Sequence, residues 1–258
     1  MTGTVHPTAV VAQGAELGAG VEIGPYCVVG PQVVIGDGTR LLSHVVVDGR
    51  TRIGKRCTVF PFASLGTQTQ DLKFRGGQTF VEIGDETTVR EYVTINSGTN
   101  EGEVTRVGSH CHIMAYSHVA HACRVGNGVI MANAATLAGE VVVEDLAVLG
   151  GMVGVHQFVR IGTMAMIGGC TKLTQDCMPY MIVDGNPAKV HGINRIGLQR
   201  KNVGDEAQQR LKQAFKIVCR EEKTTSQALE KIAAEVATCP ELEHLVAFIR
   251  ASERGVIK

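Results

Sequence analysis

Two histidines lie three residues apart in the segment YSHVAHAC, and a third histidine is followed by glutamine in GVHQF. These residues are His118, His121, His156 and Gln157. A neutral imidazole, with an ordinary pKa of ~6.5, is suited to remove a proton from a hydroxyl near neutral pH. Each histidine alone could equally have a structural role. A catalytic role would require the fold to bring these residues close together.

A polar stretch at residues 66–80, GTQTQDLKFRGGQTF, brings amide, carboxylate and ammonium groups together at Gln70, Asp71 and Lys73. A second polar stretch, NSGTNEGEVT, covers residues 96–105. Both interrupt an otherwise apolar pattern, so we expect two loops that protrude from the body of the fold. Functional residues are often carried by such loops, and the charged groups of the first loop favour contact with a substrate.

The elements that position these residues follow from an aliphatic side chain at every sixth position, from Val5 to Leu173. Of 29 positions on this phase, 26 are aliphatic, and the exceptions are Asp71, Gly77 and Glu101 in the two polar stretches. A six-residue period over this length is typical of a solenoid, in which short strands and sharp bends wind around a common interior.

Strands of about five or six residues on three sides give a coil of 18 residues, with glycine supplying the bends. On that register His121, Gly139 and Gln157 form one column, about 4.8 Å apart per coil, with His156 beside it. Hexapeptide repeats of this type are known to wind left-handedly, against the usual crossover preference. The predicted fold is mainly β, a left-handed parallel β-helix of hexapeptide repeats with a C-terminal α-helical domain.

The repeat ends near Pro179 and Pro187, and beyond about Val190 the apolar spacing becomes helical. We expect helices over residues 207–217, from residue 226 and after Pro240. The predicted domains are therefore a β-helix at 1–189 and a helical domain at 190–258. The helices would cover the open end of the solenoid, and their basic run would suit an acidic carrier protein or a diphosphate.

Composition narrows the classes of function. The formal net charge is zero, so nothing favours a nucleic acid or a membrane surface as partner. Residues 1–10 lack a basic stretch followed by a long apolar run, and no segment approaches a membrane-spanning length. We therefore expect a cytoplasmic protein.

The eight cysteines include no CxxC pair, and five occupy the small-residue phase of the repeat. We expect all eight to be buried thiols in a reducing compartment, with zinc binding as the weaker alternative. The five are Cys27, Cys57, Cys111, Cys123 and Cys177, and the other three are Cys170, Cys219 and Cys239.

The predicted column suggests a reaction. His121 could take a proton from a sugar hydroxyl as that oxygen attacks a thioester. The backbone N–H of Gly139, one coil away, could then stabilise the developing oxyanion. Such a reaction requires no metal, no cofactor and no covalent intermediate.

The sequence also resembles the UDP-N-acetylglucosamine O-acyltransferases of lipid A synthesis, from about His6 into the helical tail. The matching segments are HPTAVV, IGPYCVVGP, SHVVV, QDLKF, VEIGD, SHVAHAC, NAATLAGE, VHQF, IGGC and GNPAKVHGIN. The resemblance implies transfer of a 3-hydroxyacyl group from acyl carrier protein to the sugar 3-hydroxyl of UDP-N-acetylglucosamine. It also implies a homotrimer whose active sites lie between subunits.

The same resemblance assigns roles residue by residue. His121 matches the family's general base and Gly139 its oxyanion donor, while Gly169 matches the position that limits acyl-chain length. The positions that match substrate-binding residues are Gln70, Asp71, Lys73, His118, His156 and Gln157 near the sugar, and Asn194, Arg200 and Lys201 near the nucleotide.

Four positions depart from the family pattern. The residue after the base, often acidic in the family, is Ala122, so another group, such as a backbone carbonyl, would orient His121. Asn96 and Glu140 stand where the family has histidines, and Ile196 replaces an acidic position near the nucleotide. These differences leave open a related UDP-amino sugar as the acceptor.

Three other interpretations compete. A sister enzyme that acylates a sugar amine would normally carry an additional N-terminal uridine-binding domain, whereas here the repeat begins at Val5. A carbonic anhydrase on the same fold would need three zinc histidines, and the spacing of His118 and His121 does not match its pattern. A purely scaffolding solenoid would not explain the histidine column or the QDLK segment.

Overall fold

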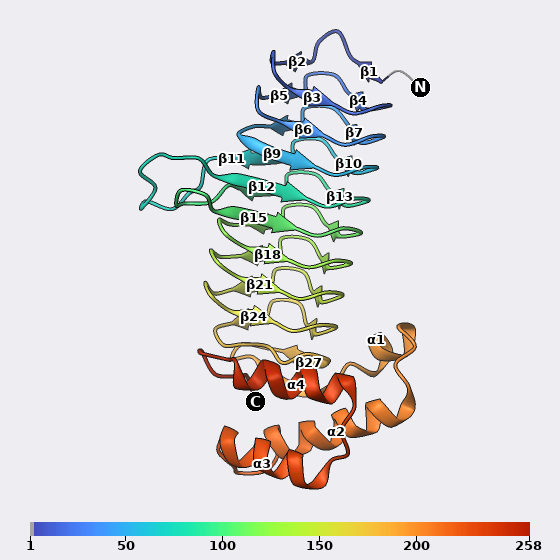
Figure 1. Cartoon of the computed structure of the whole chain (residues 1–258), viewed down its shortest axis with the longest axis vertical. Helices are drawn as coiled ribbons and strands as arrows, with labels where there is room; N and C mark the ends of the chain where they lie inside the picture. The colour runs from blue at the N-terminus through green and yellow to red at the C-terminus, as the bar shows by residue number, and fades with distance from the viewer. Residues whose placement is uncertain (1–2) are drawn as a thin grey trace.

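The computed structural model describes residues 3–258, so the first two residues of the predicted β-helix domain and of the N-terminal segment lie outside it. The chain winds into a tall stack of triangular coils, and each side of the stack is a parallel sheet, named here A, B and C (Figure 1). The helices lie at the C-terminal end of the stack.

Within residues 3–258, successive coils contribute parallel strands to the three sheets, and sheet A ends with β28, which pairs antiparallel with β27. Sheet A consists of β1 (Thr4–Val5), β4 (Glu22–Ile23), β7 (Arg40–Leu41), β10 (Thr58–Val59), β13 (Thr88–Val89), β16 (His112–Ile113), β19 (Ile130–Met131), β22 (Val148–Leu149), β25 (Met166–Ile167), β27 (Met181–Asp184) and β28 (Lys189–Ile193). Sheet B consists of β2 (Val10–Val11), β5 (Val28–Val29), β8 (Val46–Val47), β11 (Ser64–Thr67), β14 (Thr94–Asn96), β17 (His118–Val119), β20 (Thr136–Leu137), β23 (Gly154–Val155) and β26 (Lys172–Leu173). Sheet C consists of β3 (Glu16–Leu17), β6 (Val34–Ile35), β9 (Arg50–Ile53), β12 (Phe80–Ile83), β15 (Val104–Val107), β18 (Arg124–Val125), β21 (Val142–Val143) and β24 (Arg160–Ile161).

The register of these sheets confirms the predicted coil. Val119 pairs with Leu137, and Leu137 with Val155, at spacings of 18 residues. The two predicted loops lengthen their coils, because Val59 pairs with Val89 and Val89 with Ile113. The loops are slightly shorter than predicted, since β11, β12, β14 and β15 extend into the two polar stretches.

Most strands contain two residues, not the predicted five or six. The rest of each hexapeptide forms the bend, so the chain has only a short straight segment on each side. The aliphatic residue of each strand points inward and is almost completely buried from Ile23 onwards, whereas Val5 in the first coil is 48% exposed because no earlier coil covers it.

The prediction that glycine supplies the bends is wrong for much of the stack. Many bends contain a non-glycine residue at positive φ, including Ala122 at 55° and Glu140 at 61°. The repeat glycines instead permit close stacking of coils. A Cβ on Gly36 would lie 2.6 Å from the carbonyl carbon of Gly54 in the next coil, well inside van der Waals contact.

The cysteine prediction is confirmed for the five repeat positions, which are buried free thiols. It is wrong for Cys170, which is exposed, and for Cys219 and Cys239, which are half-buried. Cys170 has φ of 59° at the outer point of a bend, so its side chain cannot enter the interior. Among residues 3–258, no cluster of three or more His, Cys, Asp or Glu side chains could hold a metal ion.

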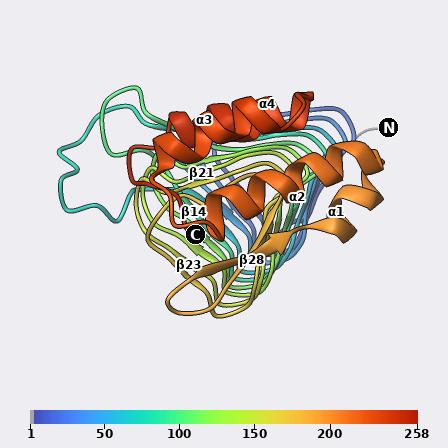
Figure 2. The same ribbon diagram turned by 90° about the horizontal axis from the view of Figure 1, so that it is seen from below.

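The predicted helices are confirmed as α2 (Asp205–Cys219), α3 (Thr225–Glu235) and α4 (Pro240–Arg250). An additional short helix, α1 (Arg195–Arg200), precedes them and was not predicted. Seen from below, α2 and α4 lie across the end of the coil stack, as a cap would (Figure 2). Within residues 3–258, no helix combines the length and the apolar character needed to cross a membrane. The boundary at residue 189 stays a prediction, and β28 lies across it.

A half-buried polar cluster joins the cap to the stack. His244 of α4 contacts Glu144 (Nε2–Oε2, 3.0 Å) and Tyr180 (Nδ1–Oη, 2.9 Å), and Thr163 donates to Glu144 through its N–H and its hydroxyl. Burial opposes ionisation of Glu144, but the His244 and Thr163 hydrogen bonds outweigh it and hold the pKa of the carboxyl below its usual value. Burial raises the pKa of the Tyr180 phenol, which therefore stays protonated beside His244 Nδ1.

We expect Glu144→Ala to lower the free energy of unfolding by about 2 kcal/mol, because several charge-assisted hydrogen bonds are lost. Urea titration followed by circular dichroism would measure this change. The matched control is Glu82→Ala, which breaks the exposed Glu82–Arg106 pair and should cost less than about 1 kcal/mol. Because the folded-state pKa of Glu144 is lowered, its stabilisation is complete above the ordinary glutamate pKa and disappears as the pH falls through the folded value. A pH-independent difference between the two proteins would contradict this account.

Candidate active site

His121 lies in the bend between β17 and β18, at the vertex where sheets B and C meet. The bends of successive coils are in register, because the Glu140 N–H donates to the His121 carbonyl (3.0 Å) and the Phe158 N–H to the Gly139 carbonyl (3.2 Å). The predicted stacking of His121, Gly139 and Gln157 is therefore confirmed as geometry.

The imidazole of His121 packs directly on the Cα of Gly139. A Cβ placed on Gly139 would overlap the His121 Nε2, Cε1 and Cδ2 atoms, so only glycine leaves room for the ring. Within residues 3–258, the Gly139 N–H donates no hydrogen bond to another protein group. The bend thus places the imidazole beside an N–H that has no hydrogen-bond partner in the described part of the chain, on a glycine that is itself buried.

Asp71 reaches the same point from the loop between β11 and β12. Its Oδ2 lies 3.7 Å from His121 Nε2, and each of these two side chains is only 18% exposed. The other ring nitrogen, Nδ1, is buried and has no hydrogen-bond partner among residues 3–258. The expectation that a backbone carbonyl orients His121 is therefore wrong, and the ring is instead held between Gly139 and Asp71.

The charges around this pair are well defined. The Lys73 N–H donates to Asp71 Oδ1 (3.0 Å) and holds the pKa of the carboxyl below its usual range, with a smaller contribution from the charged form of His121. Burial lowers the pKa of His118, whose Nδ1 faces the Thr94 hydroxyl at 2.7 Å. Near neutral pH the site therefore combines an ionised Asp71 with a neutral His118.

The loop that carries Asp71 projects away from the stack, and the loop after β14 lies beside it (Figure 1). Gln70 and Lys73 are exposed on this loop. Leu72, which directly precedes Lys73, is 92% exposed. The loop therefore presents polar and apolar side chains to the space outside the chain.

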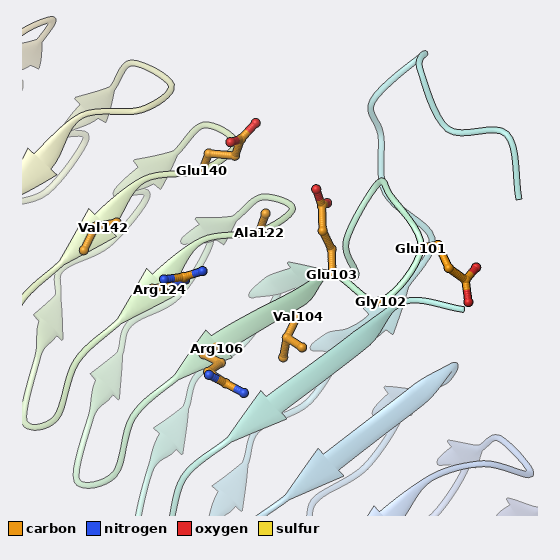
Figure 3. Close-up of a pocket in the computed structure, with 9 residues that line it drawn as sticks. All are labelled: Glu101, Gly102, Glu103, Val104, Arg106, Ala122, Arg124, Glu140 and Val142. Atoms are coloured by element: carbon orange, nitrogen blue, oxygen red, sulfur yellow. The ribbon is translucent and has the colours of Figure 1, made fainter. Parts of the chain in front are cut away.

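A cavity of about 620 Å³ lies on the sheet C side of the His121 bend (Figure 3). The carboxylates of Glu103 and Glu140 point outward at its rim, and Arg106 and Arg124 lie on the strands below. Ala122 also lines this cavity, and neither Ala122 nor Glu140, which depart from the family pattern, forms a hydrogen bond with His121 Nδ1.

Glu103 is a site residue that was not predicted from the sequence. Burial opposes its ionisation, but hydrogen bonds from Asn100 and from the Thr99 N–H hold the pKa of its carboxyl below the usual value, and charged His121 adds a smaller effect. Its position within the second polar stretch was the available signal. Through these hydrogen bonds Glu103 stabilises the loop between β14 and β15, and its carboxylate adds a second negative charge near His121.

His156 and Gln157 lie at the same vertex two coils beyond His121, after the coil that carries Gly139, and both are exposed. His156 Nδ1 lies 3.4 Å from Arg254 Nη2, which connects this bend to the C-terminal segment. These two residues thus belong to the same edge of the stack as His121, as predicted.

The remaining predicted residues are not brought to His121 within one chain. Asn194 caps α1, with its Oδ1 accepting from the Gly197 N–H and its Nδ2 donating to the Met164 carbonyl. Arg200 lines a different cavity, of about 830 Å³, whose wall is the outer face of sheet A. Lys201 follows it at the end of α1, and Gly169 lies in a bend between sheets A and B. The His121 vertex is opposite sheet A, so these groups face another side of the prism.

Comparisons with known proteins agree with this architecture. The profile described as bacterial transferase hexapeptide (six repeats) matches residues 14–49 and 105–139. The profile described as UDP N-acetylglucosamine O-acyltransferase, domain 2, matches residues 176–257. An acyl-[acyl-carrier-protein]–UDP-N-acetylglucosamine O-acyltransferase of Thermodesulfovibrio yellowstonii is 47% identical over 255 residues, which are 98% of this chain and 99% of the relative. The chain belongs to the UDP-N-acetylglucosamine O-acyltransferase family.

Solved structures of this family superpose closely. The UDP-N-acetylglucosamine acyltransferase LpxA of Bacteroides fragilis has a TM-score of 0.97 at 40% identity, covering 99% of this chain and 100% of that one. LpxA of Acinetobacter baumannii has a TM-score of 0.95 at 41% identity, covering 98% and 99%. The fold is therefore the left-handed parallel β-helix with C-terminal helices, as predicted for this acyltransferase family.

Proposed function

We propose that the protein transfers a 3-hydroxyacyl group from acyl carrier protein to the 3-hydroxyl of UDP-N-acetylglucosamine, the first step of lipid A synthesis. The observation that carries the proposal is the arrangement around His121. Its Nε2 faces the ionised Asp71 at 3.7 Å, too far for a direct hydrogen bond, beside the available N–H of Gly139. A sugar hydroxyl between the two side chains could contact both.

The reaction follows from these groups. His121 Nε2 accepts the proton of the sugar hydroxyl as its oxygen forms a bond to the thioester carbonyl carbon. The Gly139 N–H stabilises the negative charge that develops on the carbonyl oxygen. The tetrahedral intermediate then loses the thiolate of the carrier arm, which takes the proton back from the imidazolium. Atoms and charges balance with no covalent enzyme intermediate and no cofactor.

Other residues are proposed to bind the substrates. Gln70, Asp71 and Lys73 would contact the sugar and its phosphates from the projecting loop. His118, His156 and Gln157 would line the cleft on the edge of the stack. The residues of α1 and its end, Asn194, Arg200 and Lys201, would bind the nucleotide, and Gly169 would admit a long acyl chain because it carries no side chain. The basic residues after Arg195 suit an acidic carrier protein, and a cytoplasmic location fits these substrates.

We also propose a homotrimer. The nucleotide-binding residues face sheet A and His121 lies at the opposite vertex, so one chain alone would hold an incomplete site.

A ladder of aromatic rings, which runs along the edge between sheets A and B, also favours an oligomer. Neighbouring ring centroids are 4.9–5.0 Å apart, and four of the rings are 45–62% exposed. The ladder consists of Tyr26, His44, Phe62, Tyr92 and Tyr116. An exposed aromatic surface of this kind favours contact with another chain. Sedimentation equilibrium should give the mass of three chains, and a monomeric mass would contradict the proposal.

The function is tested by assaying the purified protein with 3-hydroxyacyl carrier proteins of several chain lengths and a panel of UDP-sugars. We expect the highest kcat/KM with UDP-N-acetylglucosamine. The panel should include the analogue with an amine at the 3-position, because the changes at Asn96, Glu140 and Ile196 left a related amino sugar open. A preference for that amine would replace the proposed acceptor, and turnover of no UDP-sugar would refute the proposal.

A further inference from the structure

Asn96 is buried, with 4% of its surface exposed, at the end of β14 where the second loop begins. Its Nδ2 lies 3.1 Å from the Thr67 hydroxyl, 3.4 Å from the Thr67 carbonyl and 3.0 Å from the Gln68 carbonyl. Its Oδ1 faces Gln70 Nε2 at 3.4 Å. One amide thus contacts three residues of the loop that leads to Asp71.

A second set of contacts connects the same loop to the reacting groups. The buried hydroxyls of Thr69 and Thr99 lie 3.1 Å apart, and the Asp71 N–H donates to the Thr69 hydroxyl (3.1 Å). The Thr99 hydroxyl also lies 3.4 Å from Asp71 Oδ2, the oxygen that faces His121. Asn96 therefore holds residues on both sides of Thr69, and Thr69 and Thr99 hold Asp71.

We infer that Asn96 is a positioning residue, which sets the place of Asp71 beside His121 through residues 67–70. The inference rests on the proposed function, because it assumes that Asp71 contacts the acceptor sugar. The side-chain hydrogen bonds of Asn96 go to Thr67, Gln68 and Gln70, and none goes to His121 or Asp71. Without the Asn96 amide, the Gln68 carbonyl and the Thr67 hydroxyl would each lose a hydrogen-bond donor. Residues 67–70 would then shift so that these oxygens could accept hydrogen bonds from water.

The chemistry of the amide explains why asparagine serves here although the resemblance places a histidine at this position. The two N–H groups of an amide can serve more than one acceptor while its oxygen accepts from Gln70. A neutral imidazole offers a single N–H, so Asn96→His should retain part of the contacts. Alanine offers none.

The first experiment compares Asn96→Ala with the wild type in the acyl-transfer assay. We expect kcat/KM for UDP-N-acetylglucosamine to fall by about 10- to 100-fold, because a small displacement of a substrate-orienting group has an effect of this size. The KM for the acyl carrier protein should not change. A variant that is merely partly unfolded would instead lower kcat with both KM values unaltered. Asn96→His should recover part of the loss.

The deciding experiment is a double-mutant cycle with Asp71→Asn. If Asn96 acts through Asp71, the kcat/KM of the double variant should be less than about threefold below that of Asp71→Asn alone. Ser97→Ala is the matched control, because the Ser97 hydroxyl accepts a buried hydrogen bond from Thr79 and forms no side-chain hydrogen bond with residues 67–71. Should Asn96→Ala fail to fold, Thr67→Val removes one acceptor of the same amide and should show the same non-additivity, with a smaller loss.

Fully additive losses, or wild-type kinetics in Asn96→Ala, would overturn the inference. A loss of equal size in Ser97→Ala would do so as well, since it would indicate a general effect on the loop. The proposed function is tested separately by turnover of the wild-type enzyme in the same assay. Its failure would therefore be distinguished from failure of the cycle.

Discussion

Replacement of His121 with alanine should reduce kcat/KM for acyl transfer by about 10³-fold, within the range that a general base contributes. The side chain lies in an outward bend of the stack, not in the aliphatic interior. The fold should therefore be retained, and circular dichroism and thermal unfolding should match the wild type. Steady-state kinetics with 3-hydroxyacyl carrier protein and UDP-N-acetylglucosamine would measure the effect.

His110→Ala provides the control for this prediction. His110 lies on the surface, with its Nδ1 3.3 Å from Glu86, and its side chain is 63% exposed. Removing it should leave the kinetics unchanged. Near-wild-type turnover by His121→Ala would show that His121 is not the base, and an equal loss in His110→Ala would show that the assay does not report on the site.

Replacement of Gly139 with alanine is expected to cause the second-largest loss, about 100-fold in kcat/KM. The new Cβ would overlap the imidazole of His121, so the ring must leave its place beside Asp71. The Gly139 N–H itself remains, and the change therefore tests the position of the base more than the oxyanion contact. Stopped-time assays of product formation would measure the loss.

Gly154→Ala is a suitable comparison, because nothing lies within 4 Å of a Cβ at that position. Gly154→Ala should leave kcat/KM nearly unchanged. In the His121→Ala background there is no ring to displace, so Gly139→Ala should cause little further loss. If the losses were instead additive, Gly139 would act independently of His121.

Much of the fold was predictable because the aliphatic period fixes which residues point inward. Gly139 follows His121 by one coil length of 18 residues, so the period alone predicts that the two residues stack, whatever their side chains are. The helices after residue 204 were predictable because their apolar residues follow helical spacing. The length of the strands was not, since a hexapeptide pattern does not reveal where a strand ends and a bend begins.

The position of Asp71 could not be derived from the repeat. It lies on a loop outside the repeat, and its distance from His121 depends on buried hydroxyl and amide contacts made by Thr69, Asn96 and Thr99. The same holds for Asn194, whose separation from His121 depends on how α1 meets sheet A. Local contacts of irregular segments carry no periodic signal, so these features required the structure.

The His121 vertex is proposed to direct acylation of the 3-hydroxyl of UDP-N-acetylglucosamine. The most direct test is NMR analysis of the product formed by the wild-type protein from 3-hydroxyacyl carrier protein and this sugar, with His121→Ala run beside it. We predict an ester on the 3-oxygen with the wild type and almost none with the variant. An acyl group at another position, or equal yields from the two proteins, would contradict the claim.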